Sequence, residues 1–545
     1  MTTATLPAQK TRLLPIQDIA NKLGLLPGQY EPIGAHGAKL KLDLLTNPAF
    51  PVRGKFILVT ATTPTVSGEG KTVTSIGLAQ GLERIGRTAI VTSREPSLGP
   101  VFGLKGGAAG GGLSQVEPSQ KINLHFHGDF HAITAAHNLL AAMVDSHLFH
   151  GNPLDLDPAQ VAWPRALDMN DRALRRIAVA LDSKKDGAHR ETGFVITAAS
   201  EIMAILGLAN SRADLRRRLD SIVVGVNRAG RPVTAADLGA TGAMMALLSE
   251  ALLPNLVQTT EGTPALVHTG PFANIAHGTS SVLSQQIGIR VADYVVNEAG
   301  FAADLGAEKY FDIAMRSSGI EPAVAVLVTT VQSLRAQGEG SLDSGFANLA
   351  HHIKTLRGFG VPVVVAINCF PADTEDELSA IGAECAQQGI DSAVVEAFTK
   401  GGLGAVDLAT RVVAAIDANP APNIQPAYAL DDSTEEKIRK VATQVYGASD
   451  VVLSDQAQAK LKLYAEWGFA RLPVCIAKTQ YSLTDDPKRM GAPTGWTLNV
   501  TDIQLSAGAG FLVAVAGNMM LMPGLPKAPR ALSVDVDADG NITGV

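Results

Sequence analysis

The chain contains 545 residues, of which 53 are glycine and 18% are charged. Globular chains usually contain about 7% glycine and about 25% charged residues, so this chain is glycine-rich and charge-poor, and its length excludes a small disulfide scaffold. Its net charge of -7 provides no basic surface field for a phosphate backbone, so we expect no nucleic-acid partner.

The N-terminal stretch MTTATLPAQKTRLLPIQDIANKLGLL has no continuous apolar core and no small-residue cleavage site, so we expect no signal peptide. The three cysteines, Cys369, Cys385 and Cys475, are odd in number and lack the spacing of metal ligands, which favours a reducing compartment. We therefore expect a cytoplasmic protein without a membrane partner.

Short β-branched runs bounded by glycine or proline alternate with longer helical patterns, which is typical of a parallel sheet with crossover helices. The near-continuous hydrophobicity of the runs predicts strands that are covered on both faces. The expected strands are Lys55–Ala61, Thr88–Thr92, Ser221–Val226, Val324–Thr329 and Val361–Ile367. The expected helices are Thr72–Ile85, Ala132–Phe149, Asp171–Leu181 and Ala235–Ala251.

The segment Thr62–Thr72 reads TTPTVSGEGKT and connects an expected strand to an expected helix. The strict phosphate-loop pattern GxxxxGK[ST] would need glycine at Thr65, yet Gly68 and Gly70 still let backbone amides face an anion at a helix N-terminus. Lys71 would contact the β- and γ-phosphates, and the Thr72 hydroxyl would bind magnesium. The alternative is a glycine turn beside a solvated lysine. The expected nucleotide-binding residues are Thr65, Val66, Ser67, Gly68, Glu69, Gly70, Lys71 and Thr72.

A second glycine-rich stretch follows the next expected strand. Arg94 lies just past Thr88–Thr92, at the carboxyl end of that strand, where open α/β sheets place ligands. Gly103–Gly112 reads GLKGGAAGGG, so its backbone can approach a bound group closely, with Lys105 beside it. The alternative is a flexible linker, although glycine linkers usually lie between domains.

The C-terminal part contains no charged residue from Ile503 to Pro526, but its glycines and prolines argue against a membrane helix. We expect a glycine loop, a buried strand Phe511–Ala516 and a turn. The sequence as a whole predicts an α/β protein with a P-loop NTPase-like, mostly parallel sheet and two smaller α/β domains. The expected domains are a nucleotide-binding unit at 1–360, a smaller unit at the cleft at 361–432 and a C-terminal unit at 433–545.

Several long segments occur in one order along the chain. They are TPTVSGEGKT (Thr63–Thr72), REPSLGPVFGLKGGAAGGG (Arg94–Gly112), INLHFHGDFHAI (Ile122–Ile133), DMNDRALR (Asp168–Arg175), PNLVQTTEGTPALVHTGPFANIAHG (Pro254–Gly278), EAGFAADLGAEK (Glu298–Lys309), LPVCIAKTQYSL (Leu472–Leu483), SAGAGFLVAVAG (Ser506–Gly517) and MPGLP (Met522–Pro526). In this order they resemble the formate–tetrahydrofolate ligase family, also called formyltetrahydrofolate synthetases, from about Pro15 to the end.

The resemblance implies a monofunctional ligase that makes 10-formyltetrahydrofolate, ADP and phosphate from formate, tetrahydrofolate and ATP with magnesium. Formate would attack the γ-phosphate to give formyl phosphate, and a folate amine would then attack the formyl carbon. The unit at 1–360 would bind formyl phosphate as well as nucleotide, and the unit at 361–432 would contribute to the folate cleft. The family also implies a homotetramer and a monovalent cation, potassium or ammonium.

By the same resemblance, Lys71 and Arg94 would be the catalytic residues. The guanidinium fork of Arg94 would clamp formate and then formyl phosphate, since it suits carboxylate and phosphate alike. Phe370 and Phe398 would sandwich the pterin-like ring, although either could equally be ordinary core. Phe301 and Asn368 complete the expected cofactor-binding residues.

The sequence departs from the family pattern at several positions. Leu113 stands where the glycine signature usually ends in tyrosine, Gln332 replaces an arginine, Gln337 replaces a histidine or asparagine, and Leu403 replaces an acidic residue. These substitutions concern the subunit contacts, the folate pocket and the catalytic rate. They leave the phosphate loop and Arg94 intact.

Two histidine patterns invite a functional interpretation. His125, His127, Asp129 and His131 alternate as they would on one strand face, which could suggest zinc, but we favour hydrogen-bonded histidines near the active cleft. His268 is a candidate for a polar role near the substrate, and a satisfied core histidine is the alternative.

Two other functions remain open from the sequence. One is a phosphate-loop ATPase that switches partner proteins with its nucleotide state, which would account for the phosphate loop but not for the GGAAGGG and INCFPAD segments. The other is a catalytically weakened paralogue that binds folate or nucleotide as a sensor, which Gln332 and Leu113 suggest.

Overall fold

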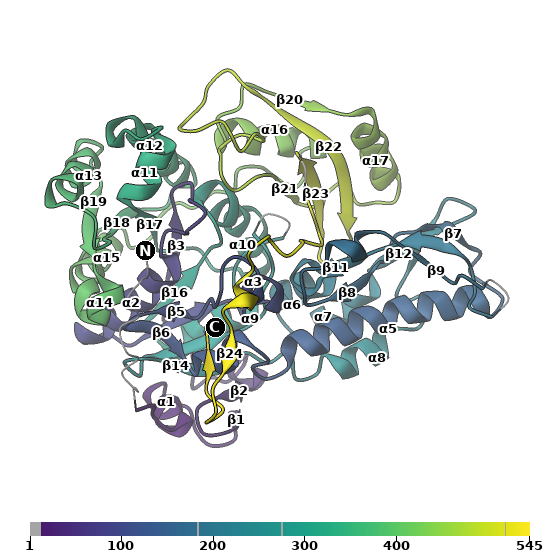
Figure 1. Ribbon diagram of the computed structural model, residues 1–545, viewed down its shortest axis with the longest axis horizontal. Helices are drawn as coiled ribbons and strands as arrows, with labels where there is room; N and C mark the ends of the chain where they lie inside the picture. The colour runs from purple at the N-terminus through teal and green to yellow at the C-terminus, as the bar shows by residue number, and fades with distance from the viewer. Residues whose placement is uncertain (1–11, 183–184, 274–275, 518, 545) are drawn as a thin grey trace.

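The computed structural model describes residues 12–182, 185–273, 276–517 and 519–544. Within them a 12-stranded sheet runs through the larger part of the molecule, on the left in Figure 1. Its parallel part has the order β15 (Pro264–Val267), β4 (Ala89–Ser93), β16 (Tyr294–Glu298), β3 (Lys55–Ala61), β17 (Val324–Thr329), β18 (Val363–Asn368) and β19 (Asp391–Val395). The expected α/β class with a mostly parallel sheet is confirmed.

An antiparallel edge extends this sheet beyond β15. It consists of β14 (Asn255–Thr259), β2 (Ala38–Leu40) and β1 (Tyr30–Pro32), while β6 (Ser114–Glu117) also pairs with β14 and with β5 (Gly110–Gly111). The glycine-rich stretch therefore ends as a short strand at the sheet, and is not a free linker.

Helices cover both faces of the parallel part. Alternate residues of β3 enter two different cores, because Ile57 and Val59 point to one face and Phe56 and Leu58 to the other. The first face carries α2 (Lys71–Arg84) and α15 (Val406–Ala418), and the second carries α9 (Val282–Val291) and α12 (Leu342–Gly358). Further helices at these faces are α1 (Ile16–Lys22), α11 (Val331–Gln337), α13 (Glu375–Gln387) and α14 (Ala397–Lys400).

A second lobe extends to the right in Figure 1. It contains α5 (Asp129–Phe149), α6 (Glu201–Leu208), α7 (Arg212–Asp220), α8 (Thr241–Leu247) and an antiparallel sheet of β7 (Leu156–Val161), β12 (Val223–Asn227) and β13 (Pro232–Thr234). The strand expected at Ser221–Val226 is therefore present as β12, but it was wrongly assigned to the parallel sheet.

Two of the expected helices in this lobe are wrong or too long. Residues 171–181 form a 3-10 turn, η2 (Arg172–Arg175), and then β9 (Ile177–Val179), which pairs with β10 (Arg190–Thr192). Residues 235–251 are helical only at α8, because Thr234 and Asp237 close a hydrogen-bonded turn ahead of it.

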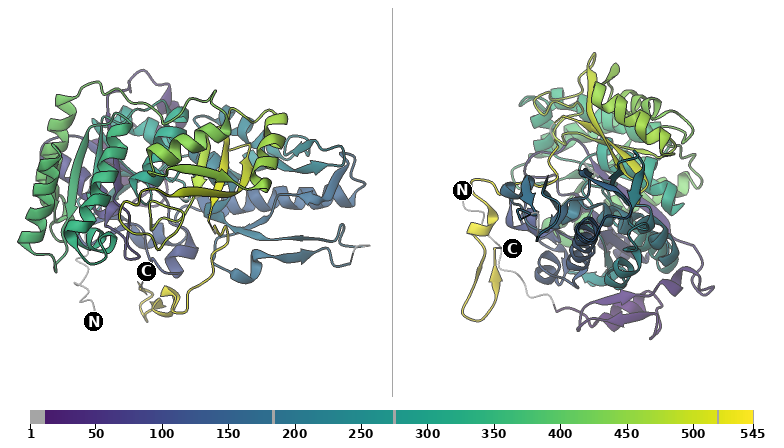
Figure 2. Two further views of the ribbon diagram at one scale, coloured as in Figure 1. Left: turned by 90° about the horizontal axis from the view of Figure 1, so that it is seen from above. Right: turned by 90° about the vertical axis from the view of Figure 1, so that its right-hand side faces the viewer.

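The C-terminal unit lies above these two parts in Figure 1. Its sheet has the order β20 (Asp450–Leu453), β22 (Thr497–Ser506), β23 (Phe511–Ala516) and β21 (Val474–Ala477), with α16 (Thr434–Gln444) and α17 (Asp455–Glu466) packed on it. The expected strand Phe511–Ala516 is confirmed. The chain then runs along the outside of the molecule, where β24 (Asp535–Val536) and β25 (Ile542–Thr543) form a hairpin (Figure 2).

Two of the three expected domains, 361–432 and 433–545, differ in whether they have a sheet of their own. β18 and β19 continue the main sheet, so the segment 361–432 has no separate sheet among the described residues. The C-terminal unit does have its own sheet, and α16 begins at the N-cap Ser433. The division into functional domains stays a prediction. In the described residues, no helix is long and apolar enough to cross a membrane.

Candidate active site

The segment between β3 and α2 is a tight loop at the carboxyl edge of the parallel strands. Gly68 has φ 79° and Gly70 has φ 71°, a left-handed backbone that favours glycine. Gly70 also has no room for a side chain, since an added Cβ would lie 2.3 Å from Asn368 Nδ2. Lys71 then begins α2, so the free backbone amides of this helix face the space above the sheet.

Glu69 fixes the shape of this loop. Its buried carboxylate accepts a hydrogen bond from Thr65 N at 2.6 Å and another from the hydroxyl of Thr330, the N-cap of α11. Asn368, at the end of β18, donates to the backbone oxygen of Glu69 at 3.2 Å. Thr330 at the N-cap of α11 and Asn368 of β18 therefore support the loop through their hydrogen bonds to Glu69.

Two cations, one carboxylate and one hydroxyl lie close together at the mouth of this loop: Lys71, Arg94, Glu298 and Thr72. Glu298, the last residue of β16, accepts a hydrogen bond from Thr72 Oγ1 at 2.7 Å and lies 3.8 Å from Arg94 Nη2. Burial lowers the pKa of Lys71, while Glu298 and Glu69 act in the opposite direction. Burial also lowers the pKa of Arg94, against the effect of Glu298. Arg94 is further held by Pro271 O, which accepts from its Nη1 at 3.0 Å.

Lys105 brings a further cation from the glycine-rich stretch. Its Nζ lies 5.1 Å from the centre of the Phe301 ring, a cation–π contact. Burial first, and then the nearby charges of Arg94 and Lys71, lower the pKa of Lys105 to about 8, although the side chain keeps exposed surface. Lys71, Arg94 and Lys105 thus bring three cations near Glu298, and this excess of positive charge suits the binding of anions.

These groups line one cavity of about 500 Å³. Among the residues predicted from the sequence, the structure brings ten together on its wall: Thr65, Val66, Ser67, Gly68, Glu69, Gly70, Lys71, Thr72, Arg94 and Phe301. Asn368, Phe370 and Phe398 are not on this wall. Asn368 instead lies behind Gly70, as described above.

The two phenylalanines expected to hold a ring lie outside the cavity. Phe370 follows β18, where its backbone N–H donates to Asp373 Oδ2 at 2.8 Å. Phe398 is 50% exposed, and its ring lies beside Gly111 and Gly112 of the glycine-rich stretch. Neither ring is fully buried, so both differ from ordinary core residues.

Several wall residues were not singled out from the sequence. Glu298 could have been found, because it ends a parallel strand at the edge where α/β sheets place ligands. Gln480 and Tyr481 reach the cavity from the C-terminal unit, and Phe272 follows β15. These three lie in the quoted segments Pro254–Gly278 and Leu472–Leu483, but no local pattern assigns them to the site, since only the folding of distant segments brings them to the loop.

The histidine patterns resolve into structural roles. The alternating set does not lie on one strand face, because Phe126 has φ 35° and Gly128 has φ 88°, and α5 begins at Asp129. His127 Nδ1 is hydrogen-bonded to Asn255 Oδ1 at 2.7 Å, and the described residues include no cluster suited to a metal ion. His268 is a satisfied core histidine, with Ser281 Oγ at 2.6 Å and Ala251 O at 2.7 Å.

None of the four departures from the family pattern lines the cavity. Gln337 is buried and donates from Nε2 to Tyr481 O at 3.4 Å, while its Oε1 accepts from Gly491 N at 3.0 Å. Leu113 is 40% exposed, and its N–H donates to Phe398 O at 2.9 Å. Leu403 and Gln332 are exposed.

Comparison with known proteins places these features in a family. The family model described as formate–tetrahydrofolate ligase matches residues 3–545. The chain belongs to the formate–tetrahydrofolate ligase family. It is 51% identical to the formate–tetrahydrofolate ligase of Symbiobacterium thermophilum and 49% identical to that of Pseudothermotoga lettingae, and both matches cover 99% of each chain. The resemblance drawn from the motifs is thereby confirmed over nearly the whole chain.

Proposed function

We propose that this chain is a formate–tetrahydrofolate ligase, which uses ATP to join formate to tetrahydrofolate and releases 10-formyltetrahydrofolate, ADP and phosphate. One observation carries the proposal: Lys71, Arg94 and the Thr72–Glu298 pair lie on the wall of the same cavity, at the start of a helix. A phosphate group and a carboxylate could both bind there. A full-length match to the family supports the same activity.

The first step is the transfer of the γ-phosphoryl group to formate. A formate oxygen forms a bond to the γ-phosphorus, the bond to the bridging oxygen breaks, and ADP leaves with the electron pair. The amides of the phosphate loop and the Lys71 ammonium face the negative charge, and Arg94 holds the carboxylate in line. The protein's contribution is chiefly placement and charge neutralisation.

The second step forms the carbon–nitrogen bond. A folate amine nitrogen attacks the formyl carbon, phosphate leaves with the electron pair of the carbon–oxygen bond, and the nitrogen releases its proton. Phosphate is a good leaving group, whereas the oxygen of free formate is a poor one, which explains why ATP is needed. Arg94, which holds formate in the first step, would hold formyl phosphate in the second, since its guanidinium suits a carboxylate and a phosphate alike.

Magnesium fits the donors present at the loop. The Thr72 hydroxyl and the Glu298 carboxylate are adjacent oxygen ligands, the type that magnesium prefers. We propose that Thr72 holds the ion as part of the ATP complex, where it would neutralise the phosphate charge. Lys71 and Arg94 bind and orient the reacting groups beside it.

The remaining family features are part of the proposal. By motif position Phe370 and Phe398 would sandwich the pterin-like ring, and Phe398 lies beside Gly111 and Gly112 of the glycine-rich stretch. Phe301, on the cavity wall, and Asn368 would complete the binding residues. We also propose a homotetramer, a monovalent cation (potassium or ammonium) and a cytoplasmic location, as in the family resemblance.

Mixing the purified protein with MgATP, formate and tetrahydrofolate tests this function. Acid converts the product to a methenyl form whose absorbance reports its amount. We expect absorbance only when all three substrates are present. ATP hydrolysis that needs neither formate nor folate would favour the nucleotide-switch alternative, and binding of substrates without product would favour the sensor alternative.

A further inference from the structure

A second cavity lies between the second lobe and the C-terminal unit. Its volume is about 170 Å³, and no described residue lines both this cavity and the one at the phosphate loop. One wall comes from α6 and the residues before it, and the other from β22 and β23, which reach down to the second lobe (Figure 1). Because an apolar cavity of about 150 Å³ holds benzene, this volume suits a ligand with a single ring.

Aromatic rings provide flat apolar surface in this second cavity. The Trp163 ring stacks on the ring of His137, with 4.3 Å between their centres, and Phe511 lies on the wall formed by β23. His137 Nδ1 is hydrogen-bonded to Ser200 Oγ at 2.8 Å and its Nε2 to Pro164 O at 3.0 Å. Both nitrogens of this histidine therefore have partners already, and neither is free for a ligand.

The carboxyl group of Glu201 is the ionisable group on this wall that remains available. Its Oε1 accepts hydrogen bonds from Gly508 N at 2.7 Å and from Ala509 N at 3.2 Å. Its Oε2 has no hydrogen-bond partner among the described residues, and the side chain keeps some exposed surface. Burial lowers the pKa of His137 to about 4, so Glu201 alone, of the described residues that line this cavity, carries a charge above pH 7.

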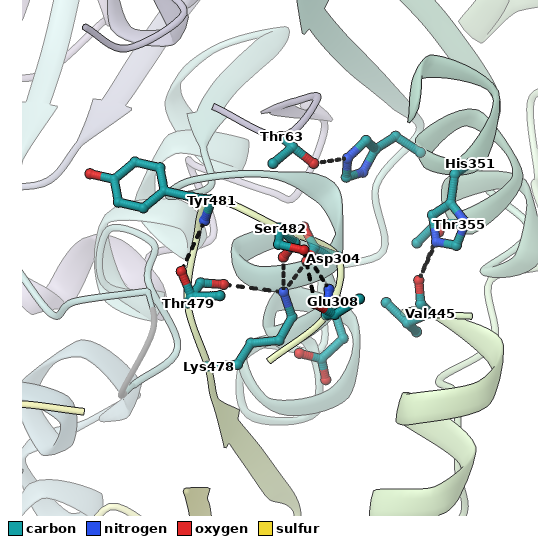
Figure 3. A network of polar contacts seen from close by, with 12 residues as sticks. Thr63, Asp304, Glu308, His351, Thr355, Val445, Lys478, Thr479, Tyr481 and Ser482 are labelled. Carbon is teal, nitrogen blue, oxygen red and sulfur yellow. Dashed lines mark hydrogen bonds and ion pairs between the residues drawn. The ribbon is translucent and has the colours of Figure 1, made fainter. Parts of the chain in front are cut away.

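A buried charge close to this cavity has the counter-ion that Glu201 lacks. Lys478 directly follows the wall residue Ala477, and its Nζ lies 2.7 Å from Asp304 Oδ2 (Figure 3). In the part of the chain that the structure describes, no lysine, arginine or histidine forms an ion pair with Glu201. A carboxylate that leaves water without a counter-ion is costly, so a cation that enters this cavity is favoured by the charge of Glu201.

Polar side chains of β22 lie on the same face as Phe511. Gln504 pairs with Val513 and Ser506 pairs with Phe511 across the two strands, and all four line the cavity. Gln504 and Ser506 keep exposed surface, so a ligand can enter from solvent on this side. The side chains of both residues have no hydrogen-bond partner among the described residues, which leaves them free to bind polar groups of a ligand.

We propose that the second cavity binds a small organic cation with one ring, an amidine or a protonated amine, which donates to Glu201 Oε2. A charge-assisted hydrogen bond of this kind is among the strong ones, and the ring would pack on Trp163 and Phe511. Formate, ATP and tetrahydrofolate are all anionic, and the last two are much larger than one ring. The site therefore takes a ligand that is not a substrate of the ligase reaction.

Benzamidine, a cation with one ring, tests the proposal at pH 8, and the neutral benzamide is the matched ligand. Calorimetry at millimolar ligand concentration should show one benzamidine bound per chain and at least tenfold weaker binding of benzamide. Saturating MgATP should not displace benzamidine, because the two cavities share no described residue.

Glu201→Gln removes the charge and keeps the size of the side chain. We expect it to weaken benzamidine binding at least tenfold and to change benzamide binding less than threefold. The matched control is Glu466→Gln, because Glu466 is exposed on α17 and does not line the cavity. It should leave the binding of both ligands unchanged.

Val515→Trp provides a second variant, which fills the cavity from β23 and decides the matter if Glu201→Gln does not fold. It should abolish the binding of both ligands. Four results in folded protein would overturn the proposal: no benzamidine binding to the wild type, equally tight binding of benzamide, displacement by MgATP, or unchanged benzamidine binding in either cavity variant.

Discussion

Lys71 is the residue on which the account depends most directly. It begins α2 on the cavity wall, with Glu298 and Glu69 as its neighbouring opposite charges. We expect Lys71→Ala to lower the rate of product formation by about 10²-fold or more, because a preorganised cation at a developing charge contributes that much. The methenyl assay measures the rate. The matched control is Lys55→Ala, an exposed lysine at the other end of β3, which should keep normal turnover.

Arg94 should act on formate more than on nucleotide. Its guanidinium faces the cavity between Glu298 and Pro271 O, beyond the phosphate loop. We expect Arg94→Ala to raise the KM for formate by about tenfold or more, since a lost charge-assisted contact is worth roughly 1.5–3 kcal/mol. ATP binding, measured by calorimetry, should change little. Normal formate use by this variant would show that the carboxylate binds elsewhere.

The residues of the loop could be predicted from the sequence, whereas the opposite wall could not. Gly68, Gly70 and Lys71 are contiguous, so their spacing already determines a loop that faces a helix start. Tyr481 reaches the same cavity only because the C-terminal unit packs there. Phe370 and Phe398 were expected at the ligand by motif position, yet their rings lie off the cavity wall.

At the scale of elements, Glu201 connects the second lobe to the C-terminal sheet. It begins α6, and its Oε1 accepts from Gly508 N at 2.7 Å and from Ala509 N at 3.2 Å, in the turn between β22 and β23. Burial raises the pKa of Glu201 to about 7 from 4.5, against the effect of these two bonds. Between pH 4.5 and pH 7, Glu201 is therefore protonated in the folded protein but deprotonated in the unfolded chain.

This difference makes stability depend on pH. The contribution of Glu201 to the free energy of unfolding falls as pH rises from 4.5 to 7, because the unfolded state binds fewer protons there. The side chain in Glu201→Gln is neutral at both pH values and still accepts both hydrogen bonds. We therefore expect the free energy of unfolding of this variant, relative to that of wild type, to be about 1–3 kcal/mol higher at pH 8 than at pH 5. Urea unfolding at both pH values measures this gain.

The exposed Glu466 on α17 provides the control, since Glu466→Gln should give the same difference from wild type at both pH values. A Glu201→Gln variant whose stability relative to wild type is the same at pH 5 and pH 8 would contradict the assigned proton.

The elements that the sequence predicted best are those that local burial determines. β3 and β17 have the expected bounds, because an apolar run between helices fits a strand covered on both faces. The helix expected at Asp171–Leu181 failed because β9 gains its partner β10 from residues farther along the chain. Such strand pairing depends on contacts between segments that are separated in the sequence, and no local pattern predicts these contacts.

At the scale of the whole molecule, the main sheet collects the chemistry at one edge. β3, β4 and β16 are neighbours, and each delivers a cavity residue at or just beyond its carboxyl end: the phosphate loop, Arg94 and Glu298. The C-terminal unit closes the same cavity with Gln480 and Tyr481. The glycine-rich composition has a local reason here, because the loop and the glycine-rich stretch both lie on the cavity wall.

Oxygen labelling of formate tests the central claim most directly. If formate attacks the γ-phosphorus in this cavity, one of its oxygens becomes the bridge of formyl phosphate and leaves with the phosphate. Starting from formate labelled with ¹⁸O at both oxygens, we predict inorganic phosphate that carries one ¹⁸O for each molecule of 10-formyltetrahydrofolate formed, as measured by mass spectrometry. Phosphate without ¹⁸O, released while product forms, would contradict the account.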